Sequence, residues 1–231
     1  MDRSREVRVH TSLLADVERR FLVWMAQRLP AGITSDHLTL LGAIGTLGSG
    51  ACYAVAPTYP AAVWGAVGML VLNWFGDSLD GTVARVRRIE RPRYGYYVDH
   101  VIDLAGTSLL FAGLACSGLI NPLLAVTLLA AYLLVSAEAY LATHATAVFR
   151  MSFFGFGPTE LRIVLAAGAI KAANGASVEI AGLGSLRLFD VGALVAITGL
   201  VVAFTMSAAR NARTLYRAEP APHRTPVTRA A

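Results

Sequence analysis

Six long stretches of mainly apolar residues follow one another along the chain, separated by short segments that contain Pro, Gly or Asn. A transmembrane helix needs about 20 apolar residues to cross a hydrocarbon core of about 30 Å, and each stretch is near that length. The pattern therefore predicts an all-α polytopic membrane protein with six transmembrane helices, over residues 36–56, 60–87, 94–118, 121–149, 158–176 and 187–213.

A shorter amphipathic stretch precedes the first apolar one. Between residues 11 and 29, apolar side chains recur every three or four positions with Arg and Gln between them, which is typical of an interfacial helix that lies on the bilayer. We therefore expect a cytoplasmic N-terminus with this helix over 1–32, a six-helix transmembrane domain over 33–215 and a disordered cytoplasmic tail over 216–231.

Composition and charge agree with a membrane protein. Hydrophobic residues make up 55% of the 231 positions and charged residues 15%, whereas soluble domains are about 25% charged. The net charge of +5 comes largely from arginines in the segment 86–94 and after residue 209, with only Lys171 and Arg187 predicted on the other side. This asymmetry follows the positive-inside rule. It predicts an integral protein of the cell inner membrane, in contact with membrane lipids, and no nucleic-acid partner.

Four aspartates lie near the cytoplasmic ends of the second and third predicted helices, at Asp77, Asp80, Asp99 and Asp103. A carboxylate near the bilayer centre costs at least about 2.5–3.5 kcal/mol, so these groups need a partner. Spacings of three and four residues place each pair on one helix face. Ligands that are all oxygen favour a hard divalent ion, Mg²⁺ above all with Mn²⁺ as an alternative, and the open positions that Mg²⁺ usually keeps favour phosphate chemistry.

The residues around these acids carry a recognisable motif. The segment Asp77-Ser-Leu-Asp80-Gly81-Thr-Val-Ala84-Arg85, followed after nine residues by Gly95-Tyr-Tyr-Val-Asp99-His-Val-Ile-Asp103, resembles the signature of the CDP-alcohol phosphotransferase (CDP-alcohol phosphatidyltransferase) family. The resemblance implies the transfer of a substituted phosphate from a CDP-linked donor to the hydroxyl group of an alcohol acceptor, with release of CMP. It also implies a centre of two metal ions.

The resemblance implies a role for each motif residue. Asp77, Asp80 and Asp99 would be metal ligands, and Asp103 would be both a ligand and the general base. The nucleotide and diphosphate would bind at Gly81, Ala84 and Arg85. The segment 33–39 is similar to the one that opens the family's first transmembrane helix and touches the nucleotide, which adds Asp36 to this group, although Ser35 stands where Pro is common.

The acceptor site is less defined by the sequence. Arg150 and Arg162 lie near the loop between the fourth and fifth predicted helices, where they could hold a phosphate on the acceptor. The alternative is that Arg150 anchors the chain at the membrane surface and that Arg162 and Glu160 pair with neighbouring helices. We expect Glu138 to pair with another helix and His144 to lie in a buried seam, and the roles of these residues stay open.

Several functions remain as alternatives. The expected reaction is phosphatidyl transfer from CDP-diacylglycerol to a small polar alcohol in phospholipid biosynthesis. Transfer of a CDP-linked headgroup to a lipid alcohol uses the same signature. A non-enzymatic divalent-cation transporter is less favoured, because the acids gather at one end of their helices beside an arginine. Glycines at 42, 45, 48 and 50 predict close helix packing, with a homodimer contact as the alternative.

Overall fold

The computed structural model describes residues 15–146, 158–174, 177–180 and 184–219. Within these ranges the chain forms α1 (Ala15–Arg28), α2 (Ser35–Val55), α3 (Ala62–Arg87), α4 (Pro92–Cys116), α5 (Pro122–Thr146), α6 (Pro158–Ala173), β1 (Ser177–Ile180), β2 (Gly184–Arg187) and α7 (Leu188–Ala218). The predicted helical fold is confirmed. The antiparallel pair β1–β2, in which Ser177 lies opposite Arg187, was not predicted.

In the described part of the chain, four helices are long and apolar enough to cross a membrane: α2, α4, α5 and α7. They make the chain an integral membrane protein. Helix α6 has only 16 residues, fewer than the roughly 20 that a perpendicular crossing needs. Helix α3 has 26 residues, but its second half carries aspartates and arginines. That α3 and α6 also span the membrane stays a prediction.

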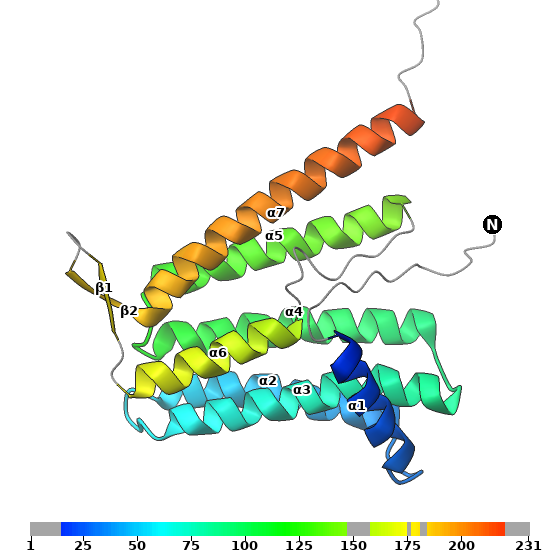
Figure 1. Cartoon of the computed structure of the whole chain (residues 1–231), viewed down its shortest axis with the longest axis horizontal. Helices are drawn as coiled ribbons and strands as arrows, with labels where there is room; N and C mark the ends of the chain where they lie inside the picture. The colour runs from blue at the N-terminus through cyan, green and yellow to red at the C-terminus, as the bar shows by residue number, and fades with distance from the viewer. Residues whose placement is uncertain (1–14, 147–157, 175–176, 181–183, 220–231) are drawn as a thin grey trace, which may run out of the picture.

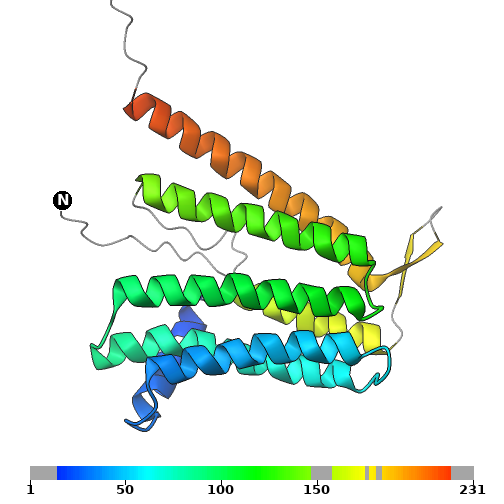
Figure 2. The same cartoon turned by 180° about the vertical axis from the view of Figure 1, so that it is seen from behind.

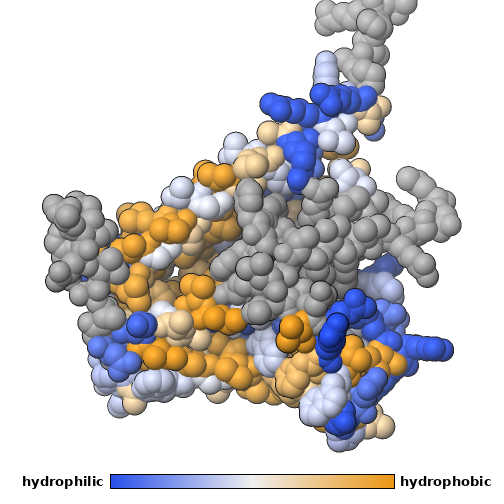
Figure 3. All heavy atoms as spheres, in the orientation of Figure 1, coloured by the Kyte–Doolittle hydropathy of each residue, from blue (hydrophilic) through white to orange (hydrophobic). Residues whose placement is uncertain are grey.

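The helices form two groups. Helices α2, α3, α4 and α6 run alongside one another, while α5 and α7 form a pair on the other side of α4 (Figures 1 and 2). Figure 3 shows apolar side chains along the sides of the long helices and hydrophilic ones gathered at the end near α1 and at the far end of α7. The connection between α3 and α4, which separates the two halves of the aspartate motif, lies at this end near α1 (Figure 1).

Small residues allow helix backbones to approach closely, as the glycine pattern predicted. A Cβ atom added to Gly45 of α2 would lie 2.4 Å from the backbone nitrogen of Asn73 in α3, and one added to Gly113 of α4 would lie 2.0 Å from the carbonyl oxygen of Gly50 in α2. Neither separation is sterically allowed. Contacts within one chain therefore explain these glycines, and the homodimer stays a prediction.

Helix α1 runs across the long helices and packs on α3 (Figure 1). Leu22 and Ala26, one turn apart on one face, are buried beside Leu79 and Val83 of α3. The side chains of Val17, Phe21 and Trp24 are 74%, 46% and 49% exposed. This amphipathic distribution is what an interfacial helix needs, and the location of α1 at the membrane surface stays a prediction.

Arg87 at the end of α3 holds the loop between α1 and α2. Its guanidinium group donates hydrogen bonds of 2.6–3.4 Å to four carbonyl oxygens of that loop, those of Leu29, Pro30, Ala31 and Ile33. Its place in the basic segment indicated only a role in topology. The structure adds a role in fixing the entry to α2.

Candidate active site

Three of the four predicted carboxylates converge in space. Ligand oxygens of Asp77, Asp99 and Asp103 lie within 4.8 Å of one another. Asp77 comes from α3 and the other two come from α4, and α2 packs against both of these helices. Gly42 and Ala43 of α2 line the space between them. Gly42 has no side chain and Ala43 has only a methyl group, which leaves room for the three carboxylates to lie close together.

Asp80 borders the same cavity, but its oxygens are engaged by neighbouring groups. One carboxylate oxygen accepts a hydrogen bond of 2.6 Å from the Thr39 hydroxyl, and the other accepts one from the backbone N–H of Gly81. Asp80 is outside the group of three carboxylates that lie within 4.8 Å of one another. As a metal ligand it stays a prediction.

The segment 33–39 meets the main motif at Asp80. Ser35 donates a hydrogen bond of 2.9 Å to the carbonyl oxygen of Asp80, so the residue that departs from the family pattern makes a specific contact. Thr34 begins α2 through a capping box with His37, which fixes the first turn and thereby places Ser35 and Thr39 toward α3. The structure thus brings the two motifs into direct contact, and the role of the segment 33–39 in nucleotide binding stays a prediction.

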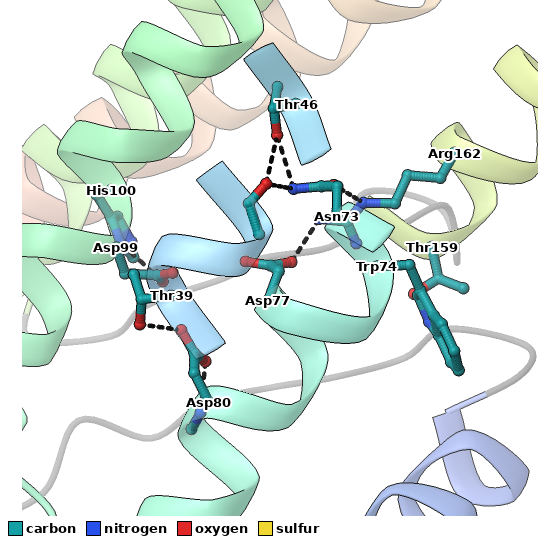
Figure 4. Close-up of polar contacts among 12 residues, drawn as sticks. Thr39, Thr46, Asn73, Trp74, Asp77, Asp80, Asp99, His100, Thr159 and Arg162 are labelled. Atoms are coloured by element: carbon teal, nitrogen blue, oxygen red, sulfur yellow. Dashed lines mark hydrogen bonds and ion pairs between the residues drawn. The ribbon is translucent and has the colours of Figure 1, made fainter. Parts of the chain in front are cut away.

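Arg162 of α6 reaches into the carboxylate group (Figure 4). A terminal nitrogen of its guanidinium group forms an ion pair with Asp77 Oδ2, and its Nε atom donates a 2.6 Å hydrogen bond to Asn73 Oδ1. The two charged side chains are only 15% and 23% exposed. Arg162 therefore pairs with a neighbouring helix and contacts a predicted metal ligand directly, and its role in binding the acceptor stays a prediction.

Asn73 is a site residue that the sequence analysis missed. Its side-chain amide donates to the Gly42 carbonyl oxygen at 3.0 Å and to Thr46 Oγ1 at 2.7 Å, while its oxygen accepts from Arg162. Both the nitrogen and the oxygen of this buried amide therefore have partners, on two different helices. A polar amide in an apolar run, one helical turn before Asp77, was the available signal.

The predicted nucleotide residues continue along α3. A Cβ atom at Gly81 would lie 3.2 Å from a guanidinium nitrogen of Arg85, so the two residues share one helix face. Arg85 also donates a 3.0 Å hydrogen bond to Thr82. Asp36 forms an ion pair with Arg91 in which both side chains are about half exposed. Asp36 thus lies on the outer surface of the α2–α4 junction.

Aromatic rings flank the α4 side of the site. The His100 ring lies 4.2 Å from the Tyr96 ring and 5.0 Å from that of Tyr140 on α5, centroid to centroid. Its Nδ1 atom is 3.4 Å from Asp99 Oδ2. The sequence motif contains His100 but gave it no role, and nothing in the chain pattern pointed to Tyr140.

The remaining predicted residues have different outcomes. Glu138 accepts a 2.8 Å hydrogen bond from Asn211 of α7, which confirms that it pairs with another helix. The expected buried seam at His144 is wrong, because this side chain is exposed near the end of α5. Arg150 and the side chain of Glu160 lie outside the described residues.

The carboxylate group fits a divalent ion. Ligand oxygens about 2.0–2.1 Å from one Mg²⁺ ion lie at most about 4 Å apart, which is close to the separations found here. The predicted ligands are all hard oxygens, and the group is partly buried, so an ion would neutralise repulsion among them. Binding of one divalent ion would therefore require only small movements of these side chains, including release of Asp77 from Arg162.

Comparisons with known proteins point in one direction. A family model described as CDP-alcohol phosphatidyltransferase matches residues 33–205. The crystal structure of Mycobacterium tuberculosis phosphatidylinositol phosphate synthase with CDP-DAG bound is similar, with 19% sequence identity and a TM-score of 0.57 over 89% of this chain and 98% of that chain. At this identity the likeness shows a shared fold. No curated protein matches the chain.

Proposed function

Because the chain belongs to the CDP-alcohol phosphatidyltransferase family, whose members transfer substituted phosphate groups, we propose that it transfers a phosphatidyl group from CDP-diacylglycerol to a small polar alcohol. CMP is the second product. The observation that carries this proposal is the convergence of Asp77, Asp99 and Asp103 from α3 and α4. The similar synthase was crystallised with CDP-DAG bound, which supports a donor of the same class.

The four aspartates would hold the metal centre, which we propose to contain two Mg²⁺ ions, with Mn²⁺ as a substitute. Asp77, Asp99 and Asp103 already point their oxygens toward one another. Asp80 would join them from the same cavity, with Thr39 fixing its carboxylate orientation. Bound divalent ions supply positive charge that offsets the charge of the donor's diphosphate and of the leaving CMP.

Asp103 would act as the general base. Its carboxylate lies within 4.8 Å of those of Asp77 and Asp99, so an acceptor hydroxyl beside it would be close to a donor diphosphate bound at this group. Asp103 would take the hydroxyl proton while the acceptor oxygen bonds to phosphorus and the bond from phosphorus to the CMP oxygen breaks. The proton thus goes to Asp103, the phosphatidyl group goes to the acceptor oxygen, and CMP leaves with the bridging oxygen.

The remaining residues would bind the two substrates. Gly81 has no side chain and Ala84 has only a methyl group, so the nucleotide could approach the α3 backbone there. Arg85, whose guanidinium group lies beside Gly81, would contact the diphosphate. Asp36 would contact the nucleotide from the first turn of α2. On the opposite side of the carboxylates, Arg162 would bind a phosphate or another anionic group of the acceptor, with Arg150 as a second candidate.

The membrane orientation follows from the charges. The hydrophilic end near α1 and the basic end of α7 would face the cytoplasm, so that the acyl chains of the donor stay in the inner membrane while its nucleotide is in water. A homodimer is a further proposal.

CMP release by the purified full-length chain tests the proposal. The assay contains detergent, Mg²⁺ and CDP-diacylglycerol, with inositol phosphate, glycerol phosphate, serine or inositol as the acceptor. Release that depends on one acceptor and is lost in Asp80→Ala would support phosphatidyl transfer. CMP release only with a CDP-linked headgroup and diacylglycerol would show that the lipid is the acceptor and not the donor. No CMP release from folded protein with any donor and acceptor would favour a cation transporter.

A further inference from the structure

Glu18 of α1 joins three helices that lie far apart in the sequence. Its Oε1 atom accepts a hydrogen bond of 2.8 Å from Trp74 Nε1 of α3 and another of 2.9 Å from Thr159 Oγ1 of α6. Trp74 and Thr159 lie beside each other in Figure 4. Glu18 is one helical turn before Leu22 on the face of α1 that packs against α3. The carboxylate therefore bridges α3 and α6 from a helix that is itself packed on the bundle.

The two hydrogen bonds of Glu18 lie next to the contacts that Arg162 makes with Asn73 and Asp77. Thr159 is in the first turn of α6, three residues before Arg162, a rise of about 4.5 Å along the helix axis. Trp74 directly follows Asn73, which accepts the hydrogen bond from Arg162. Displacement of the first turn of α6 would therefore displace the guanidinium group that is paired with Asp77.

We propose that Glu18 is a positioning residue that fixes the first turn of α6 on α3 and so keeps Arg162 paired with Asp77. The inference rests on the proposed function, which places Asp77 among the metal ligands. Through this pairing, α1 controls how readily Asp77 is released to a divalent cation. The N-terminal helix thus tunes the metal site without contacting it.

Two opposing effects make the proposal testable. The guanidinium group of Arg162 competes with a cation for the Asp77 carboxylate, so a loosened Arg162 makes cation binding tighter. The negative charge of Glu18 attracts a cation from a distance, so loss of that charge alone makes cation binding weaker. The direction of the change in cation affinity therefore distinguishes positioning from simple electrostatics.

The experiment measures the affinity of Mn²⁺, used alone as the probe, by electron paramagnetic resonance of the full-length chain in detergent. We expect Glu18→Ala and Thr159→Val each to tighten Mn²⁺ binding about three- to tenfold, as for coupled neighbouring sites. Glu18→Gln should not tighten Mn²⁺ binding and should weaken it slightly, because its amide oxygen can accept both hydrogen bonds while the negative charge is lost. Arg162→Gln should also tighten binding, and adding Glu18→Ala to it should produce no further tightening.

Glu90→Ala provides a matched control, since Glu90 is exposed in the α3–α4 loop and its removal changes charge without breaking this bridge. Weaker or unchanged Mn²⁺ binding in both Glu18→Ala and Thr159→Val would overturn the inference. Equal tightening by Glu18→Ala with and without Arg162 would overturn it as well. If Glu18→Ala fails to fold, Thr159→Val decides alone. Absence of Mn²⁺ binding in the unmodified protein would overturn the proposed ligand set itself.

Discussion

The hydroxyl group of Thr39 donates a 2.6 Å hydrogen bond to the carboxylate of Asp80, across 41 positions of sequence. This contact joins the segment that opens α2 to the aspartate motif of α3. Together with the hydrogen bond from the Gly81 N–H, it fixes the direction of the Asp80 carboxylate at the cavity wall. Groups that orient a metal ligand are often as necessary as the ligand itself.

Thr39→Val removes this hydrogen bond and preserves the shape of the side chain. Because Asp80 then loses one of its two fixed partners, we expect CMP release to fall about 10- to 100-fold, as when other groups that orient a metal ligand are removed. The measurement is the initial rate at several Mg²⁺ concentrations. Thr39→Ser keeps the hydroxyl and should retain most activity, so an equal loss in both variants would contradict the assignment.

Asp103→Asn tests the general base. The amide cannot accept a proton from the acceptor hydroxyl at neutral pH, so turnover should fall by about 10²–10⁴-fold. Binding of CDP-diacylglycerol, measured separately by calorimetry, should remain largely intact because Asp77, Asp80 and Asp99 are unchanged. Retained turnover would remove Asp103 from this role.

Removal of divalent ions tests the metal centre directly. Dialysis against EDTA should abolish CMP release, and added Mg²⁺ or Mn²⁺ should restore it, because without a divalent ion the carboxylates of Asp77, Asp99 and Asp103 would repel the negatively charged diphosphate of the donor. Asp99→Asn should require a higher Mn²⁺ concentration for the same rate. Full activity in EDTA would exclude a dissociable divalent ion from the reaction.

The aspartate motif shows what the sequence could predict. Spacings of three and four residues on helices, together with the cost of charge in a membrane, predicted that the four aspartates share one site. Asp77, Asp99 and Asp103 converge, whereas Asp80 borders the same cavity outside that group. The helix order and most helix boundaries also followed from apolar runs and breaker residues. These are local properties, and each is encoded within about one helix length.

Contacts between distant segments were beyond the sequence pattern. Asn73 binds Arg162 across 89 positions, and Glu18 binds Thr159 across 141, with no periodic signal at either end. The β1–β2 hairpin was missed because its two strands have four residues each and lie in a mixed stretch between two helices. His144 was expected in a buried seam, but its side chain lies on an exposed part of α5, while the neighbouring Thr143 is buried.

Gly45→Ala tests the close packing of α2 on α3. The added methyl group would lie 2.4 Å from the Asn73 backbone nitrogen, so the helices must separate and the Asn73 contacts to α2 must weaken. We expect a loss of about 1–3 kcal/mol in the free energy of unfolding, as for other overpacked cores. Thermal unfolding in detergent measures it. Gly68→Ala on α3 meets nothing within 4 Å and should leave stability unchanged or slightly higher.

Arg87→Ala tests the anchoring of the loop between α1 and α2. The substitution leaves the carbonyl oxygens of residues 29, 30, 31 and 33 without their shared donor, and water can replace only those that are exposed. We expect faster proteolysis and faster amide exchange in this loop.

Arg93→Ala removes the same charge from an exposed position of α4 and should leave the loop protected. Since the loop leads into the first two turns of α2, which carry Ser35 and Thr39, the orientation of Asp80 should loosen as well. Equal loop protection in both variants would show that Arg87 serves membrane topology alone.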